Sequence, residues 1–284
     1  MEKKSQFWSY AVMNTALNRN PVWSGFLLLF LFSNSLLADT VLITGSNSGI
    51  GLDFARRYAE QGYDVIATHR RDSIPNTLKD LSSNHKNVRI ERVDISNLED
   101  IDALARKLRN IPVDILINNA SITDAGAFSS PENFSKQVVG NLDYGLFDQY
   151  MATNARGTIK MSEAFLPHIR AGKQKKIVVI SSDAAQMSVP DERPGLYWYH
   201  ASKVAANMVM KKFARDLKHE GIIVVVFHPG FVRTDKSVPK QKISKMAYMI
   251  DLEESVPGMM DVISYITLED TGSFLKWTGE HQAW

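Results

Sequence analysis

Short runs of apolar, β-branched residues alternate with longer amphipathic stretches over most of the chain. We interpret the runs as strands, at Thr40–Gly45, Asp64–His69, Asn87–Asp94, Val113–Ala120, Lys176–Ser182 and Ile222–Gly230. Their nearly continuous apolar character is typical of strands that are covered on both faces. The stretches between them have helical periodicity; one ends at Gly62, and Asn97 is placed to cap another. This order predicts an α/β fold with a single Rossmann-type doubly wound parallel sheet and helices on both faces.

The N-terminus does not follow this pattern, so we predict an extension at 1–38 and one domain at 39–284. Basic residues precede the apolar run Gly25–Ala38, which is the arrangement of a secretion signal. The run is shorter than the roughly 20 residues that span a bilayer. Three alternatives stay open for the extension: a signal, a membrane anchor, or a segment whose apolar face packs on the domain.

The composition narrows the function classes. The net charge of +2, from 33 basic and 31 acidic residues, is too small for a nucleic-acid partner, and none is expected. The chain has no cysteine, which excludes disulfides, thiolate metal sites and a cysteine nucleophile. We expect no metal.

The turn after the first predicted strand reads TGSNSGIG, Thr44–Gly51. Its three glycines let the backbone turn sharply and approach a pyrophosphate at the start of the next helix. A plain tight loop is the alternative. A nucleoside triphosphatase is disfavoured, because Leu52 and Asp53 stand where a phosphate-binding P-loop has Lys followed by Ser or Thr.

The end of the second predicted strand bears on the choice of dinucleotide. An NAD site has an acidic residue there, but this chain has His69 followed by Arg70 and Arg71. Because a guanidinium can bind a 2′-phosphate, NADP(H) is preferred and NAD(H) stays possible. Two arginines on a solvated loop are the alternative. Since these dinucleotides are intracellular metabolites, the expected location is cytoplasmic, with export and membrane association left open by the extension.

The segment YWYHASK, Tyr197–Lys203, precedes an apolar run and is a candidate for acid–base chemistry. On a helix, Tyr199 and Lys203 lie one turn apart on one face, and Tyr197 and His200 turn away from it. An adjacent ammonium favours the phenolate and lowers the pKa of a tyrosine, which makes the pair a general acid/base. A surface pair is the alternative. Ser182 adds a hydroxyl at the carboxyl edge of the sheet, where such folds bind ligands.

Together, TGSNSGIG, NNAS (Asn118–Ser121), Ser182, YHASK and HPGFVRT (His228–Thr234) resemble the short-chain dehydrogenase/reductase family over 39–284. The C-terminal stretch is similar to its C-factor or Sniffer-like carbonyl reductase branch. The resemblance implies a dinucleotide-binding catalytic domain and an NADP(H)-dependent oxidoreductase that interconverts a small-molecule carbonyl and an alcohol. A dinucleotide-binding signalling or scaffold protein with little turnover is the alternative. A homo-oligomer, dimer or tetramer, is implied by the family alone.

The resemblance also assigns roles. Tyr199 is the acid/base, Lys203 lowers its pKa and binds the nicotinamide ribose, Ser182 orients the carbonyl, and Asn154 supports a water that relays protons to the lysine. With Arg70, the implied cofactor-binding residues are Gly45, Ser46, Asn47, Gly49, Ile50, Gly51, Asp94, Ile95, Asn118, Ala120, Tyr199, Lys203, Pro229, Gly230, Val232 and Thr234. The alternatives are a helix kink at Asn154, a strand-end cap at Ser182, a helix cap at Asp94 and a plain turn at 229–234.

Some positions depart from the family pattern. Ser121 and Ala185 replace glycines, and Ser182 and Tyr199 are 17 positions apart, so SVPDERPGL is expected to loop out near the substrate. The lysine-rich segment 235–251 is a predicted lid. An anionic or amphipathic substrate is one interpretation of its lysines, and a solvated lid face is the other.

Overall fold

The computed structural model describes residues 38–122, 135–189, 195–234 and 249–284. The predicted extension, most of the predicted lid and part of the predicted loop after Ser182 lie outside these residues. The strands are β1 (Thr40–Ile43), β2 (Asp64–His69), β3 (Val88–Arg92), β4 (Ile115–Asn118), β5 (Lys176–Ile180), β6 (Ile223–His228) and β7 (Phe274–Lys276). The α-helices are α1 (Gly49–Glu60), α2 (Asn76–Asn84), α3 (Leu98–Lys107), α5 (Tyr144–Tyr150), α6 (Thr158–Ala164), α7 (Leu166–Ala171), α8 (Tyr197–Leu217) and α9 (Leu252–Tyr265). A π-helix, η2 (Met151–Gly157), joins α5 to α6, and η3 (Asp183–Ala185) and η4 (Lys218–Glu220) are 3₁₀-helices.

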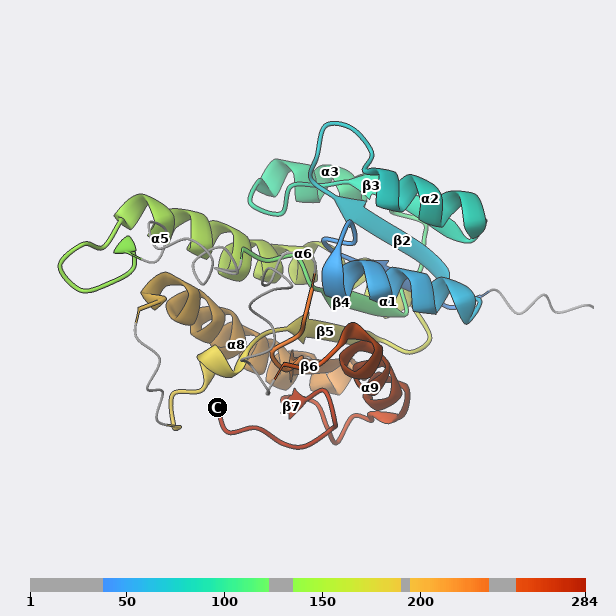
Figure 1. Ribbon diagram of the computed structural model, residues 1–284. Coiled ribbons are helices and arrows are strands. Elements are labelled where there is room, and N and C mark those ends of the chain that lie inside the picture. Colours follow the sequence, from blue (N-terminus) through green and yellow to red (C-terminus); the bar gives the residue numbers. More distant parts are fainter. Residues whose placement is uncertain (1–37, 123–134, 190–194, 235–248) are drawn as a thin grey trace, which may run out of the picture. The chain divides into compact units, whose positions relative to one another are not determined.

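The strands form one parallel sheet in the order β3-β2-β1-β4-β5-β6-β7 (Figure 1). The order runs outward in both directions from β1 and β4, so the crossovers before and after this point lie on opposite faces. The fold is therefore the predicted Rossmann-type doubly wound sheet, and the carboxyl ends of β1 and β4 flank its switch point.

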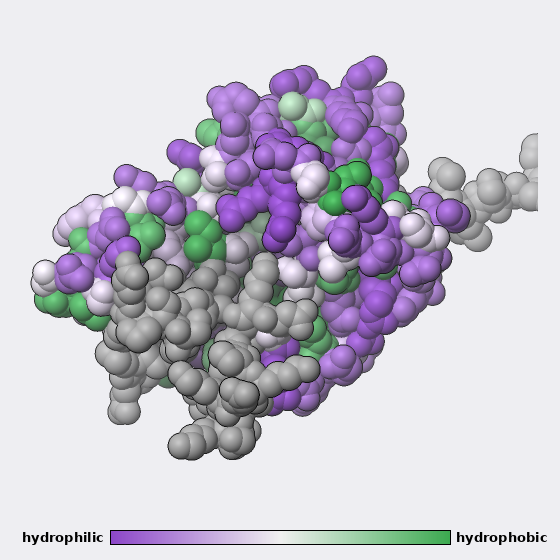
Figure 2. Space-filling view, turned by 45° about the horizontal axis from the view of Figure 1, so that its top comes forward, coloured by the Kyte–Doolittle hydropathy of each residue, from purple (hydrophilic) through white to green (hydrophobic). Residues whose placement is uncertain are grey.

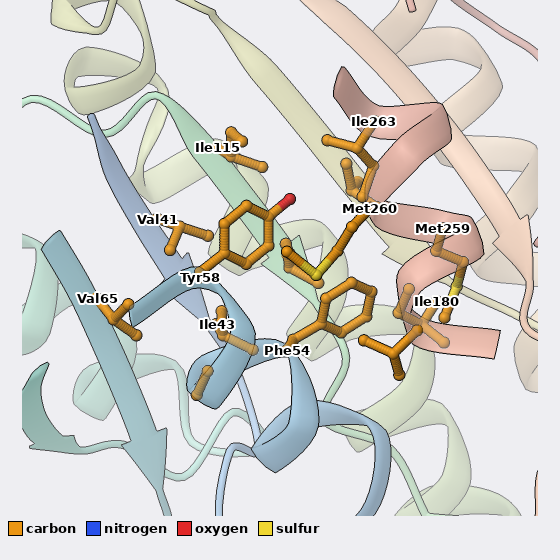
Figure 3. Packing of buried hydrophobic residues seen from close by; sticks show 14 of the residues in the cluster. Val41, Ile43, Phe54, Tyr58, Val65, Ile115, Ile180, Met259, Met260 and Ile263 are labelled. Carbon is orange, nitrogen blue, oxygen red and sulfur yellow. The ribbon is translucent and has the colours of Figure 1, made fainter. Parts of the chain in front are cut away.

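Two apolar cores cover the two faces of the sheet. One face packs against α1, α2 and α9, and the other against α3, α6, α7 and α8. Figure 3 shows the first, where Phe54 and Tyr58 of α1 meet Met260 and Ile263 of α9 over the strands. Successive strand residues alternate between the cores: Ile43 belongs to the first and Leu42 to the second. Both faces are thus buried, which explains why the strands read as continuous apolar runs.

The helix ends follow the predicted signals. After α1, Gly62 has φ +84°, its N–H donates to Ala59 O, and the Tyr63 N–H donates to Tyr58 O, which is a Schellman motif. The rings of Tyr58 and Tyr63 pack edge to face, with their centroids 4.9 Å apart. Asn97 caps α3, since its side chain accepts the Asp100 N–H at 3.1 Å.

The described residues form seven strands, one more than the six predicted. The missed strand β7 has three residues, and all three, Phe274–Lys276, pair with β6. Three residues give too little pattern for a strand signal. Figure 2 shows one face of the molecule, where hydrophilic residues predominate and hydrophobic ones form small separate patches. Among the described residues, no helix is long and apolar enough to cross a membrane.

Candidate active site

A cavity of about 850 Å³ opens at the carboxyl ends of β1, β4, β5 and β6. The predicted site residues that line it are Gly45, Asn47, Gly49, Ile50, Arg70, Asp94, Ile95, Ala120, Ser182, Tyr199, Lys203, Pro229, Gly230, Val232 and Thr234. Four predicted residues, Ser46, Gly51, Asn118 and Asn154, are not among those that line it. The cavity spans the switch point of the sheet, where this fold class binds ligands.

The glycine-rich turn forms one wall. Gly45 has φ +69°, and a Cβ there would lie 2.9 Å from Ala120 Cα, so only glycine fits between β1 and the end of β4. Gly51, inside the first turn of α1, lies against the Asn119 amide, and a Cβ would overlap it. Thr234 lies opposite the turn, within contact distance of the position where a Cβ on Gly49 would stand.

Two of the predicted cofactor-binding residues form hydrogen bonds to other protein groups and do not face the cavity. Ser46 is fully buried; its hydroxyl donates to Ile43 O at 2.8 Å, and its N–H donates to Thr68 O at 2.8 Å. Asn118 is also buried, and its Nδ2 donates to Ser162 Oγ of α6 at 3.0 Å. Both side chains fix the strand ends from behind and do not border the cavity.

Tyr199 and Lys203 share one face of α8, as the spacing predicts. The Lys203 Nζ lies 5.8 Å from the centre of the Tyr199 ring and donates to Ile180 O of β5 at 3.0 Å. The ammonium is buried, and this desolvation lowers the pKa of Lys203 from 10.5 to about 8. It therefore stays largely protonated at pH 7.

Tyr197 and His200, which flank Tyr199, differ in their position relative to the cavity. Tyr197, the first residue of α8, is 41% exposed and is not among the cavity residues. His200 does line the cavity, which corrects the expectation that it turns away. One residue past Tyr199 is a rotation of about 100°, which leaves His200 at the border of the same face.

Ser182 follows β5 at the cavity wall. Its Oγ accepts the Ala184 N–H at 3.1 Å, which caps η3, and it donates to Asp183 Oδ1 at 2.9 Å. The preceding residue, Ser181, is turned inward and donates to Asn207 Oδ1 of α8 at 2.7 Å. Both serines line the cavity, but the Ser181 hydroxyl is bonded to Asn207 and Ser181 is buried, so Ser182 is the better placed of the two to meet a small molecule.

The far end of the cavity is basic. His69 ends β2; it is buried, its Nδ1 has no partner among the described residues, and burial is the main cause that lowers its pKa. Arg70 and Arg71 follow on the surface, and neither forms an ion pair within the described part of the chain. Asp94, across from them, accepts the Ser96 N–H and hydroxyl and so closes a turn before α3. The predicted helix-cap role belongs to Asn97 instead.

The opposite wall was missed by sequence reasoning. Trp277 and Glu280 line the cavity just after β7, and the Trp277 N–H donates to His228 O at 2.9 Å. His228, interpreted from sequence as structural, also lines it, and its Nδ1 accepts the Asp183 N–H at 3.1 Å. These residues reach the site only because β7 pairs with β6, so no local pattern signals them.

The comparison that decides the family is with its sequence model. The model described as short chain dehydrogenase matches residues 39–244. The chain belongs to this family. Among curated relatives, an uncharacterized oxidoreductase of Schizosaccharomyces pombe is 31% identical over 84% of this chain and 94% of its own length. The C-signal protein of Myxococcus xanthus is 29% identical over 64% of this chain and 99% of its own.

Solved structures of other short-chain dehydrogenases superpose on this one. An NADPH-bound carbonyl reductase from chicken fatty liver is 29% identical with a TM-score of 0.76, over 88% of this chain and all of that chain. A Brucella melitensis 3-ketoacyl-(acyl-carrier-protein) reductase complexed with NADH is 26% identical, with a TM-score of 0.69 over 85% of this chain and 97% of that one. The carbonyl reductase Sniffer of D. melanogaster, 24% identical with a TM-score of 0.72 over 87% and 100%, shows the shared fold. The predicted family is confirmed, and the similar proteins include the C-signal protein and the carbonyl reductase Sniffer.

Asn154 takes a structural place in this short-chain dehydrogenase. It lies in the π-helix η2, where its Oδ1 accepts the Ile122 N–H at 2.7 Å and its Nδ2 donates to Ile122 O at 2.9 Å and to Ser202 Oγ at 3.1 Å. The side chain thus ties the segment after β4 to α8. Short π-helical turns inside α-helices are frequently found at functional sites. Its predicted part in a proton relay stays a prediction.

The two family departures fit the fold. Neither Ser121 nor Ala185 is among the non-glycine residues with positive φ, so neither position requires glycine here. Ser121 lines the cavity and Ala185 is buried in η3. A side chain is therefore accommodated at both places without backbone strain.

Proposed function

We propose that this short-chain dehydrogenase uses NADP(H) to interconvert a small-molecule carbonyl and an alcohol, with Tyr199 as acid/base, Lys203 as its electrostatic partner and Ser182 as the group that orients the substrate oxygen. In reduction, a hydride adds to the carbonyl carbon, the π electron pair moves to oxygen, and the Tyr199 hydroxyl proton is transferred to that oxygen. In oxidation, the Tyr199 phenolate takes the proton back.

One observation carries the proposal: Lys203 is buried beside the Tyr199 ring with no carboxylate partner among the described residues. A desolvated ammonium opposes folding, so it is expected where its charge has a task. Next to a phenol, that charge stabilises the phenolate and so eases proton transfer. Ser182, which follows β5, borders the same cavity.

The chain's residues fit a nicotinamide dinucleotide. The glycine turn brings bare backbone and the N-terminus of α1 to the cavity, and Gly45 admits no Cβ there. His69 lines the same cavity, and its buried Nδ1 has no partner among the described residues. A bound reduced nicotinamide supplies the hydride. Lys203, Tyr199 and the segment Pro229–Thr234 are the residues that would hold its ribose and amide end.

The residues at the end of β2 support NADP(H) over NAD(H). No carboxylate ends β2, and the guanidinium groups of Arg70 and Arg71 have no ion-pair partner in the described part of the chain. Free guanidinium groups are suited to a 2′-phosphate, which an acidic residue would repel. Relatives bound to NADPH and to NADH both exist, so the assignment rests on these arginines.

The experiment compares NADPH and NADH oxidation with a panel of aldehydes, ketones and quinones, for the unsubstituted protein and for Tyr199→Phe. We expect turnover with NADPH and a loss of about 10²- to 10⁴-fold in Tyr199→Phe, with dinucleotide affinity retained. Tyr197→Phe is the matched control, because it removes an exposed hydroxyl from the same helical turn. Near-normal rates in Tyr199→Phe would overturn the role of Tyr199. Tight dinucleotide binding without turnover of any compound would favour the scaffold alternative. The family also leads us to infer a homo-oligomer, which sedimentation can test.

A further inference from the structure

The carboxylate of Asp183 holds the Ser182 hydroxyl. Ser182 Oγ donates to Asp183 Oδ1 at 2.9 Å and accepts the Ala184 N–H at 3.1 Å. A hydroxyl has one proton to donate, so this arrangement leaves none for a substrate oxygen. Asp183 itself lines the cavity, and its backbone N–H is fixed to His228 Nδ1 at 3.1 Å. Asp183 is therefore a residue of the wall that meets the substrate.

Asp183 and a carbonyl substrate compete for the same proton. A carboxylate is a stronger acceptor than a neutral carbonyl oxygen, because the bond to it is charge-assisted. A substrate whose only polar group is its carbonyl must draw the Ser182 hydroxyl away from Asp183, so the carboxylate loses the Ser182 hydrogen bond. Removing a donor from a half-buried charged group is unfavourable. Such a substrate gains little from Ser182.

A substrate with its own donor avoids this competition. Its hydroxyl or ammonium group can donate to Asp183 while the Ser182 hydroxyl rotates to the carbonyl oxygen. The oxygens of an α-hydroxyketone are on adjacent carbons, and the groups that they would meet, Ser182 Oγ and Asp183 Oδ1, are neighbours at 2.9 Å. The carbonyl and the hydroxyl of the substrate, the Ser182 hydroxyl and the Asp183 carboxylate then all have a hydrogen-bond partner.

We propose that Asp183 selects carbonyl compounds that carry a hydrogen-bond donor, a hydroxyl or an ammonium group, on the carbon next to the carbonyl. The inference rests on the proposed function and names the substrate class of that site. The redox step is unchanged: hydride to carbon and the Tyr199 proton to oxygen. Asp183 determines which carbonyl compounds receive the hydrogen bond from Ser182.

The test uses 2-hydroxyacetophenone and 2-methoxyacetophenone, which share one skeleton; in the second compound a methyl group replaces the hydroxyl hydrogen, so the donor is absent. With NADPH, we expect kcat/KM to be about ten-fold higher for the hydroxyketone, the effect of one additional hydrogen bond to a charged group. In Asp183→Ala the ratio should fall toward one. In Asp183→Asn, which keeps the shape and a weaker, neutral acceptor, it should be intermediate. Glu280→Gln is the matched control and should keep the full ratio, because Glu280 is another acidic residue of the wall and pairs with Lys276.

A binding measurement separates this inference from the proposed function. The dissociation constants of both ketones are measured by calorimetry on the Tyr199→Phe protein loaded with NADPH, with and without Asp183→Ala. A hydroxyketone preference that Asp183→Ala removes supports the inference even if the unsubstituted protein oxidises no NADPH, a result that would refute the proposed function alone. Equal behaviour of the two ketones in the protein with Asp183 intact overturns the inference, and this includes the case in which neither binds. A preference that survives Asp183→Ala also overturns it.

Discussion

Replacing Lys203 by Met tests whether the buried Lys203 ammonium lowers the free energy of unfolding. Burial lowers the pKa of Lys203 from 10.5 to about 8. At about 1.4 kcal/mol for each pH unit, the charged form therefore opposes folding by about 3 kcal/mol at pH 7. Methionine has nearly the same length and removes this penalty. It also removes the hydrogen bond to Ile180 O, whose loss at a buried carbonyl costs about 1–3 kcal/mol.

The two effects nearly cancel, so Lys203→Met should change the free energy of unfolding at pH 7 by no more than about 1–2 kcal/mol. The sign of the pH dependence follows from the lowered pKa. The unfolded chain keeps the Lys203 proton up to about pH 10.5, but the folded protein releases it near pH 8. The penalty on the unsubstituted protein is complete below pH 8 and disappears as the pH rises to 10.5. The advantage of Lys203→Met should therefore shrink by about 2–3 kcal/mol across this window.

Urea unfolding of both proteins without dinucleotide, at pH values from 7 to about 10.5, measures this difference. Turnover with NADPH, measured alongside, should fall by about 10²- to 10⁴-fold in Lys203→Met. Lys176 provides the control, because it is also a buried lysine of lowered pKa that donates to a carbonyl, Ile263 O, but it begins β5 at the end away from the cavity. Lys176→Met should keep its turnover. A stability difference for Lys203→Met that does not change with pH would refute a desolvated charge at this position.

Two further changes test the dinucleotide site. Arg70→Ala should lower kcat/KM for NADPH by about ten-fold relative to NADH, since it removes a charge-assisted contact to the 2′-phosphate only; an equal loss with both dinucleotides would show that Arg70 does not read the phosphate. Gly51→Ala places a Cβ against the Asn119 amide and should weaken NADPH binding and destabilise the fold by about 1–3 kcal/mol. Gly62→Ala is its control: the position is open but has φ +84°, so it should cost about 1 kcal/mol with unchanged binding in a fluorescence titration.

The sequence predicted those parts of the fold whose signals are local. Six strands have enough consecutive apolar residues to stand out, and Gly62 and Asn97 mark helix ends by their own backbone chemistry. The strand β7 has no such signal, because Phe274 and Leu275 become a strand only through pairing with β6. Everything that β7 positions was lost with it, including the cavity wall at Trp277.

Site residues divide in the same way. Tyr199, Lys203 and Ser182 follow from helix spacing and from a strand end, and all three line the cavity. Ser46 and Asn118 stand in the expected motif, but the motif does not say which side chains point inward to bind protein groups. Motif position and side-chain direction are separate facts, and only tertiary contacts decide the second.

The relative placement of Ser182 and Tyr199 is set by the joint between β5 and α8. Lys203 donates to the carbonyl of Ile180, and Asn207, one helical turn later, accepts from Ser181 at 2.7 Å. Two residues four apart on the helix thus hold two consecutive residues of the strand end, which fixes the rotation of α8 about its own axis. Since one residue corresponds to about 100°, a small rotation would turn Tyr199 out of the cavity and break both bonds. Lys203 therefore acts twice, through its charge on the phenol and through its hydrogen bond on the helix. For that reason an arginine, which has the charge but a wider head group, is a poor substitute at this position.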